Sequence, residues 1–286
     1  MAPTVQELIN ILQKIAPEAL AEDWDNVGLL VGKPSQPIHK VLLALDPSPT
    51  LVNDAVTNEC DLILTHHPLI FRPLKSLRTD QPTGQFIALA LQHNIAVIGC
   101  HTNLDATIGG VSDVLAEGLG ITNTSPIVGN NSDCTTEMSC GLGRIGTYNT
   151  ALHPQDFIDR LLQTCRPPWL LEAGRRPQQV KTVAVCGGSC GDFAERAFAQ
   201  GADVFVTAEI KHSVARWAED AGFWIIDGGH FATENPAMVA LQQQLQQHLA
   251  AANIPITITT AQQQAPLRII KESVETTLTL NCTPHA

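Results

Sequence analysis

A formal net charge of −11 over 286 residues, with only 17 Lys and Arg, argues against a protein that binds long polyanions. Such proteins need clustered cations, and no cluster here exceeds the pair Arg175-Arg176. No apolar run approaches the length of a membrane span, and no basic region followed by an apolar stretch opens the chain. We therefore expect no nucleic-acid partner, no membrane partner, no secretory signal and a cytoplasmic location.

The first predicted element is an amphipathic helix over residues 4–16. Thr4 and Glu7 have the spacing of a capping box, and apolar side chains recur at helical spacing behind them. Strands follow over 41–46, 62–65 and 95–99, alternating with helices over 50–58, 84–93 and 111–119. Strands that alternate with helices indicate βαβ units and a mainly parallel sheet.

Two of these strands end in potential metal ligands. The strand over 62–65 runs into His66-His67, and the strand over 95–99 is followed by His101 and, four residues later, Asp105. Ligand sites in open α/β sheets lie outside the carboxyl ends of the strands. Neighbouring residues on an extended chain point to opposite sides, so His66 and His67 can serve two ions or straddle one site.

The second half of the chain repeats this order of elements. Strands are predicted over 181–186, 202–207 and 223–227, with helices over 193–200 and 213–221 between them, and His230 and Glu234 follow the last strand. The sequence 202–207 corresponds to 60–65, with an Asp at the same place in each. The pattern indicates an internal duplication.

Sequence signals in the remaining segments complete the architecture. Residues 153–163 are predicted as a helix, 236–251 as a long helix, 254–260 as a strand and 273–280 as an edge strand. We expect an α/β protein of two similar lobes, with mainly parallel or mixed sheets flanked by helices and a metal site in the cleft between them. The predicted boundaries are 1–120 for the first lobe, continued by the C-terminal segment, 121–179 for a connector, and 180–286 for the second lobe, without an inserted third domain.

Imidazole and carboxylate ligands of this kind suit zinc, iron, manganese or nickel. Four histidines and two carboxylates exceed what one tetrahedral ion uses, so the sequence favours two ions about 3.5–4 Å apart. The alternative, that these are unrelated polar strand ends, is weaker because the arrangement occurs three times.

Three other features leave alternatives open. Glu209, Lys211 and His212 either line the cleft or lie on an exposed first helical turn. Cys186 and Cys190 could bind metal, although packing and a turn position are favoured, and we expect all eight cysteines to be free thiols. The turn over 187–191 is either an anion cradle or a tight strand–helix turn.

Five segments, in order, resemble the family named for the NGG-interacting factor Three, often labelled GTP cyclohydrolase I type 2 homologues. The segments are Trp24-Asp-Asn-Val-Gly-Leu-Leu30, Thr65-His-His-Pro68, His101-Thr-Asn-Leu-Asp105, Gly141-Leu-Gly-Arg-Ile-Gly146 and Gly228-Gly-His-Phe-Ala-Thr-Glu234. One departure is Ala208, where relatives often have Gly between the Thr and the acid.

The resemblance implies a two-lobed α/β fold with a dinuclear metal site in the cleft and a ring-shaped hexamer, a trimer of dimers. The metal ligands that it implies are His66, His67, Asp105, His230 and Glu234. His101 matches the family's motif at the edge of the site.

These observations predict a metal-dependent hydrolase that acts on a nucleotide or a related small substrate with metal-activated water. His101 is the candidate catalytic proton carrier, because its ordinary pKa suits acid–base chemistry near neutrality. The alternative is a non-enzymatic metal-binding scaffold or regulatory protein, which predicts the same ligands.

Overall fold

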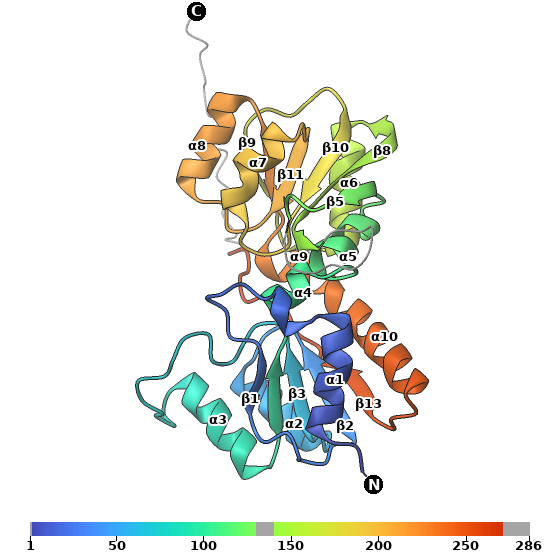
Figure 1. The fold of residues 1–286 in the computed structure, drawn as a ribbon. Helices are drawn as coiled ribbons and strands as arrows, with labels where there is room; N and C mark the ends of the chain where they lie inside the picture. The colour runs from blue at the N-terminus through green and yellow to red at the C-terminus, as the bar shows by residue number, and fades with distance from the viewer. Residues whose placement is uncertain (1, 130–139, 271–286) are drawn as a thin grey trace, which may run out of the picture.

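The computed structural model describes residues 2–129 and 140–270, which form two lobes, each built on one sheet (Figure 1). The short helices α4 (Thr102–Ala106) and α9 (His230–Glu234) lie between the two sheets in this view. Helices flank both sheets, so the structure confirms the predicted mixed α/β fold. Within the described residues, no helix is long and apolar enough to cross a membrane.

The first sheet has the strand order β1-β4-β3-β2-β13. Its central strands β2 (Lys40–Ala44), β3 (Leu62–Thr65) and β4 (Ala96–Gly99) are parallel, and β13 (Thr257–Thr260) adds to β2 in parallel. The edge strand β1 (Gly28–Val31) is antiparallel to β4 and was not predicted. It overlaps the end of the segment 24–30 that carries the first family motif.

Strand residues of the first sheet alternate between two cores, as the twofold period of a strand requires. Leu43, Leu62 and Ile98 pack against α1 (Val5–Ile15) and α10 (Pro236–Ala251) on one face. Leu42, Ile63 and Val97 pack on the other face, against α2 (Pro49–Thr57) and α3 (Pro82–Gln92). Burial on both faces explains why these strands read as continuous apolar runs. The capping box predicted at the start of α1 is present.

The second sheet has the order β5-β8-β10-β11-β12-β9. Its parallel centre consists of β10 (Val180–Val185), β11 (Val204–Thr207) and β12 (Trp224–Asp227). The antiparallel neighbours are β8 (Arg144–Leu152), β5 (Thr122–Ser125) and β9 (Leu171–Ala173). One face packs against α5 (Val111–Gly118) and α6 (Pro154–Cys165), and the other against α7 (Ala194–Ala199) and α8 (His212–Ala221).

The two lobes exchange elements across the predicted boundaries. The predicted connector, 121–179, supplies β5, β8 and β9 to the second sheet. In the other direction, α10 and β13 leave the range 180–286 and return to the first sheet. The remaining short elements are η1 (Glu18–Leu20), η2 (Gly191–Phe193) and the pair β6 (Val128–Gly129) and β7 (Gly141–Leu142).

The two sheets share a topology that agrees with the predicted duplication. In each sheet three parallel strands lie side by side in chain order, β2-β3-β4 and β10-β11-β12, with an antiparallel edge strand beside the last of them. The corresponding aspartates also do the same work. Asp61 accepts hydrogen bonds from the backbone of His39 and Lys40, and Asp203 accepts them from Lys181 and Thr182.

Two further expectations concern the cysteines and the C-terminal edge strand. Five cysteines are free thiols as expected, namely Cys60, Cys100, Cys165, Cys186 and Cys190. Cys140 is disulfide-bonded, so the expectation of free thiols is wrong there, because no spacing rule in the sequence signals that bond. The edge strand predicted over 273–280 lies outside the described residues.

Candidate metal centre

The strand ends bring the predicted ligands together from both lobes. His66 and His67 continue the ladder beyond β3, because their backbone N–H groups donate to Ala44 and Leu45 at 3.1 and 2.9 Å. His101 caps α4 directly after β4, and His230 opens α9 after β12. The carboxyl ends of the two parallel sheets therefore face each other, which is where open α/β sheets bind ligands.

Each of the four histidines is held at Nδ1 by an oxygen. The bonds join His66 to the Cys100 carbonyl (2.9 Å), His67 to Asp46 (2.7 Å), His101 to Asp25 (2.9 Å) and His230 to Glu209 (3.0 Å). The hydrogen-bond network assigns the proton to Nδ1, which donates to these oxygens. The lone pair at Nε2 is then left facing the cleft. Metal-binding histidines are oriented in this way by their outer partners.

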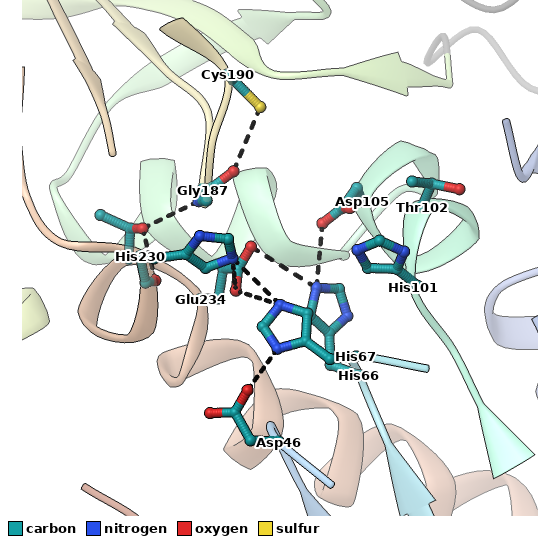
Figure 2. A network of polar contacts seen from close by, with 12 residues as sticks. Asp46, His66, His67, His101, Thr102, Asp105, Gly187, Cys190, His230 and Glu234 are labelled. Carbon is teal, nitrogen blue, oxygen red and sulfur yellow. Dashed lines mark hydrogen bonds and ion pairs between the residues drawn. The ribbon is translucent and has the colours of Figure 1, made fainter. Parts of the chain in front are cut away.

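The free nitrogens converge on Glu234 (Figure 2). The Nε2 atoms of His67 and His230 lie 3.2 Å apart, and each is 3.1 Å from Oε2 of Glu234. On the other side, Nε2 of His66 is 3.8 Å from Oε1 of Glu234 and 3.7 Å from Oδ1 of Asp105. Ring and carboxylate atoms from three separate segments thus share one small volume.

When the imidazoles are neutral, these atoms are acceptors that face acceptors. A neutral imidazole protonated at Nδ1 offers only a lone pair at Nε2, and an ionised carboxylate offers only lone pairs. Among the described residues, buried Nε2 of His66, Oδ1 of Asp105 and Oε2 of Glu234 have no hydrogen-bond partner. Buried acceptors without partners are costly and rare. Protons or cations between these atoms would remove the repulsion, and the N/O donor set is one that divalent metals accept.

Three groups of ligand atoms lie within 4.8 Å of one another in the described residues. They are His66 with Asp105 and Glu234, His67 with His230 and Glu234, and His66 with His67 and His101. Glu234 belongs to the first two groups, so one carboxylate is shared. His66 and His67 belong to different members of this pair of groups but share the third group with His101, so the ligand atoms fit both arrangements that the sequence left open.

Charge interactions shift the pKa values of the cluster in the direction of cation binding. Burial lowers the pKa of His67, but the carboxylates of Asp46 and Glu234 outweigh it and raise the pKa to about 10. His230 follows the same pattern, with Glu234 raising its pKa to about 9. Burial raises the pKa of Glu234, yet the positive charge that the three neighbouring imidazoles can carry outweighs burial and holds the pKa well below its usual range. The cluster therefore attracts positive charge strongly.

Glycine at position 188 makes room for the shared carboxylate. Gly188 has φ +70°, and a Cβ there would lie 2.1 Å from Oε1 of Glu234 and 3.3 Å from Nε2 of His230. The N–H of Gly188 donates to Thr233, and that of Cys190 donates to Thr207. Because these two amides are engaged within the protein, the structure favours the tight strand–helix turn over the anion cradle, the two alternatives that the sequence left open.

Of the three carboxylates that hold the rings, sequence reasoning missed two and left the third open. Asp46 follows β2, Asp25 lies in the motif 24–30, and Glu209 follows β11. A signal for Asp46 was present, since it ends a predicted strand in the same sheet as His66. Glu209 was left between two interpretations, and it contacts His230 from a left-handed conformation with φ +54°. That conformation falls on Glu209 itself and not on Ala208.

The other residues with open assignments lie further from the ligand atoms. Lys211 is exposed and pairs with Asp192 at 2.9 Å, and His212 is exposed at the start of α8. Cys186 and Cys190 line the cleft beside the cluster. The neighbouring Cys186 thiol and burial both raise the pKa of Cys190, whose Sγ–H donates to the Gly187 carbonyl. Neither cysteine belongs to the groups of ligand atoms found among the described residues.

Two recesses flank the cluster and share His67 and His230. The larger, about 640 Å³, reaches the coordinating side and touches His101, Asp105 and Glu234. We call it the aromatic cleft because Trp24, Phe71 and Phe193 form its walls. The smaller, about 400 Å³, touches the anchoring carboxylates Asp46 and Glu209 and is walled by Trp169. We call it the outer recess.

Comparisons with known proteins confirm the family resemblance. Residues 3–266 match the model of the family described as Duf34/NIF3 (NGG1p interacting factor 3). A Clostridium acetobutylicum protein named GTP cyclohydrolase 1 type 2 homolog is 30% identical over 260 residues, covering 90% of this chain and 96% of that protein. A Streptomyces coelicolor protein of the same name is 34% identical and covers 82% of each chain.

Solved structures share the fold over nearly the whole chain. A hypothetical protein from Staphylococcus aureus superposes with a TM-score of 0.87 at 28% identity, covering 94% of this chain and 100% of its own. A Bacillus cereus protein related to NIF3 superposes with a TM-score of 0.86 at 25% identity and the same coverage.

Proposed function

The chain belongs to the Duf34/NIF3 family, and on that premise we propose that it binds two divalent metal ions and hydrolyses a small substrate in the cleft. His66 and Asp105 would hold one ion and His67 and His230 the other, with Glu234 shared between them. This division follows the two groups of ligand atoms that have Glu234 in common. The observation that carries the proposal is the convergence of Nε2 and carboxylate oxygen atoms in these groups, of which buried Nε2 of His66, Oδ1 of Asp105 and Oε2 of Glu234 have no hydrogen-bond partner.

Bound divalent ions would supply a water of lowered pKa and positive charge for a developing oxyanion. The residues of the chain prepare the site for that chemistry. Four anchored Nδ1 atoms fix the orientation of the four rings, so little rotamer freedom is lost on binding. The nearly complete burial of Glu234 keeps solvent away from its ligand atoms.

His101 is the residue that we propose to move the proton. Its Nδ1–H donates to Asp25, whose second oxygen accepts from the backbone and hydroxyl of Thr102. This buried carboxylate keeps the tautomer in which Nε2 is free to accept a proton from the cleft side. His101 also lies within ligand distance of His66 and His67, so the experiment must separate a proton carrier from a ligand.

Names of the relatives suggest cyclohydrolase chemistry, and we carry over only the reaction class, hydrolysis of a small molecule. A metal-binding scaffold without turnover remains the alternative to this function. The two are separated by screening the metal-loaded protein against nucleosides, nucleotides, phosphoesters and cyclic amides. Turnover that requires metal supports the hydrolase, and absence of turnover across the screen with full metal supports the scaffold.

Metal analysis of single variants tests the ligand assignment. After loading and gel filtration, elemental analysis should give about two ions per chain for the parent protein. His66→Ala and Glu234→Ala should lose metal while keeping their secondary structure, because both residues lie beyond strand ends. His93→Ala, at the exposed end of α3, is the matched control and should keep all metal. One ion or none in the parent protein would contradict the dinuclear proposal.

His101→Ala should keep most of the metal and lower turnover by roughly 10²–10⁴-fold, the usual cost of a lost general acid or base. Metal loss equal to that of His66→Ala would make His101 a ligand. Full activity with full metal would show that another residue carries the proton.

We also propose that the subunits form a hexamer, a trimer of dimers, in the cytoplasm. Membership of the family supports the assembly, and closed symmetry is the general rule for homo-oligomers. Light scattering at micromolar concentration tests it.

A further inference from the structure

The aromatic cleft is the recess from which a substrate can reach the ligand atoms. It touches Asp105, Glu234 and His101, whose free atoms face inward. The outer recess instead touches Asp46 and Glu209, which hold the Nδ1 sides of their histidines. A molecule in the outer recess would therefore contact the Nδ1 sides of His67 and His230 and not their free Nε2 atoms. A volume of about 640 Å³ is within the usual range for small-molecule sites.

Two aromatic side chains stand exposed at the wall of this cleft. Trp24 is 57% exposed and Phe71 is 44% exposed, although large apolar side chains usually lie in the core. Their ring centres are 5.7 Å apart, and each is 6.1 Å from the ring of His101. Asp25, next to Trp24, is the residue that orients His101. The backbone at 24–25 thus sets an aromatic face at a fixed distance from the proposed proton carrier.

Among the described residues that line the aromatic cleft there is no Lys or Arg. Outside the ligand cluster the charged groups of the lining are the carboxylates of Glu22 and Asp192. Lys211 approaches this wall, but its ammonium group is paired with Asp192 at 2.9 Å. Bound metal could take one anionic group of a ligand. A polyphosphate chain extending further would meet carboxylates, and like charges at close range repel.

From the exposed aromatic pair and the acidic lining we propose that the aromatic cleft selects a planar ring compound with at most one anionic group. A free base, a nucleoside or a similar heterocycle fits this chemistry, and a nucleoside triphosphate does not. Trp24 and Phe71 are the specificity-determining residues, because flat aromatic faces stack on ring compounds of many kinds. The proposal rests on the proposed function only in taking the cleft as the substrate site.

A binding series with one ring and increasing charge tests this inference. Guanosine, guanosine monophosphate and guanosine triphosphate are titrated calorimetrically into the metal-loaded full chain, with metal content measured again after each titration. Guanosine and its monophosphate should bind, and the triphosphate should bind at least about tenfold more weakly, a difference of about 1.4 kcal/mol. The second measurement of metal excludes loss of ions to the triphosphate.

Variants assign the effect to the named residues. Trp24→Ala and Phe71→Ala should each weaken guanosine binding by roughly 5- to 100-fold, the range for loss of one stacking side chain. The matched control is Trp169→Ala, which removes the same kind of ring from the outer recess. It should leave guanosine binding unchanged. Glu22→Lys adds a cation to the cleft and leaves Trp24 and Phe71 in place. It should reduce the difference in affinity between guanosine triphosphate and guanosine.

Triphosphate binding as tight as guanosine binding would overturn the inference. So would absence of binding by all three compounds, or a loss on Trp169→Ala equal to that on Trp24→Ala. If Trp24→Ala changes the mass of the assembly in solution but leaves guanosine binding unchanged, the aromatic pair belongs to a subunit contact, and the inference is overturned. The binding measurement and the metal analysis do not depend on turnover. Failure of the hydrolase proposal is therefore distinguishable from failure of this inference.

Discussion

Gly188→Ala should remove metal from the site without changing any ligand or any charge. The added Cβ would lie 2.1 Å from Oε1 of Glu234, and real Cβ contacts essentially never fall below 3.0 Å. The carboxylate must therefore retreat by about 0.9 Å (3.0 minus 2.1 Å) before the contact is even tolerable. Ligand positions must hold to about 0.5 Å for function, so this displacement is too large for a shared ligand.

Backbone strain must be separated from this contact. Gly188 has φ +70°, and an L-residue in the left-handed region costs roughly 1–2 kcal/mol. Gly201 has φ +84° and nothing within 4 Å of its Cβ position, so Gly201→Ala carries the strain without the contact. Both variants should lose similar stability on the backbone side. The difference between them then reports the displacement of Glu234.

The assay is metal content after loading and gel filtration, with urea unfolding and circular dichroism on the same samples. Gly188→Ala should show metal affinity lower by about 10- to 100-fold, the range for disturbed support of a ligand, and Gly201→Ala should match the parent protein. Parent-level metal binding by Gly188→Ala, in a variant that is folded, would refute the argument that Glu234 holds metal from the observed position.

Three further outcomes are expected. Asp25→Asn should keep metal but lower turnover by roughly 10²–10⁴-fold, because an amide cannot hold the same tautomer of His101, and an unchanged rate would contradict that role. In metal-free protein, His67 and His230 have folded pKa values of about 10 and about 9 against an ordinary value of 6.5. Their contribution to the free energy of unfolding is thus complete below pH 6.5 and lost as the pH rises through 9 and 10. Urea unfolding in the presence of a chelator should therefore give a free energy of unfolding that falls across this range. A constant or rising value would contradict the charge interactions of the cluster. Light scattering should give a hexamer mass, and a monomer would remove that proposal.

The sequence alone predicted most helices and strands and most of the residues around the cluster. The parallel strands are buried on both faces and so read as apolar runs, and the amphipathic helix over 4–16 has its cap and stripe in sequence. His66, His101 and His230 could be found because ligands gather at the carboxyl ends of parallel strands, which is a local property of the chain. The edge strands β1 and β9 gave no such pattern, because an edge strand of three or four residues is too short for one.

Only the tertiary structure decided how the two halves share one site. His67 and His230 are 163 residues apart in sequence, yet their Nε2 atoms lie 3.2 Å apart. Asp25 reaches His101 across 76 residues, so its role as an anchor depends on the packing of the segment 24–30 against β4 and α4. The acidic lining of the aromatic cleft also comes from both lobes. Local patterns determine which side chains stand at strand ends, whereas the contact between lobes, which depends on long-range packing, determines which of them meet.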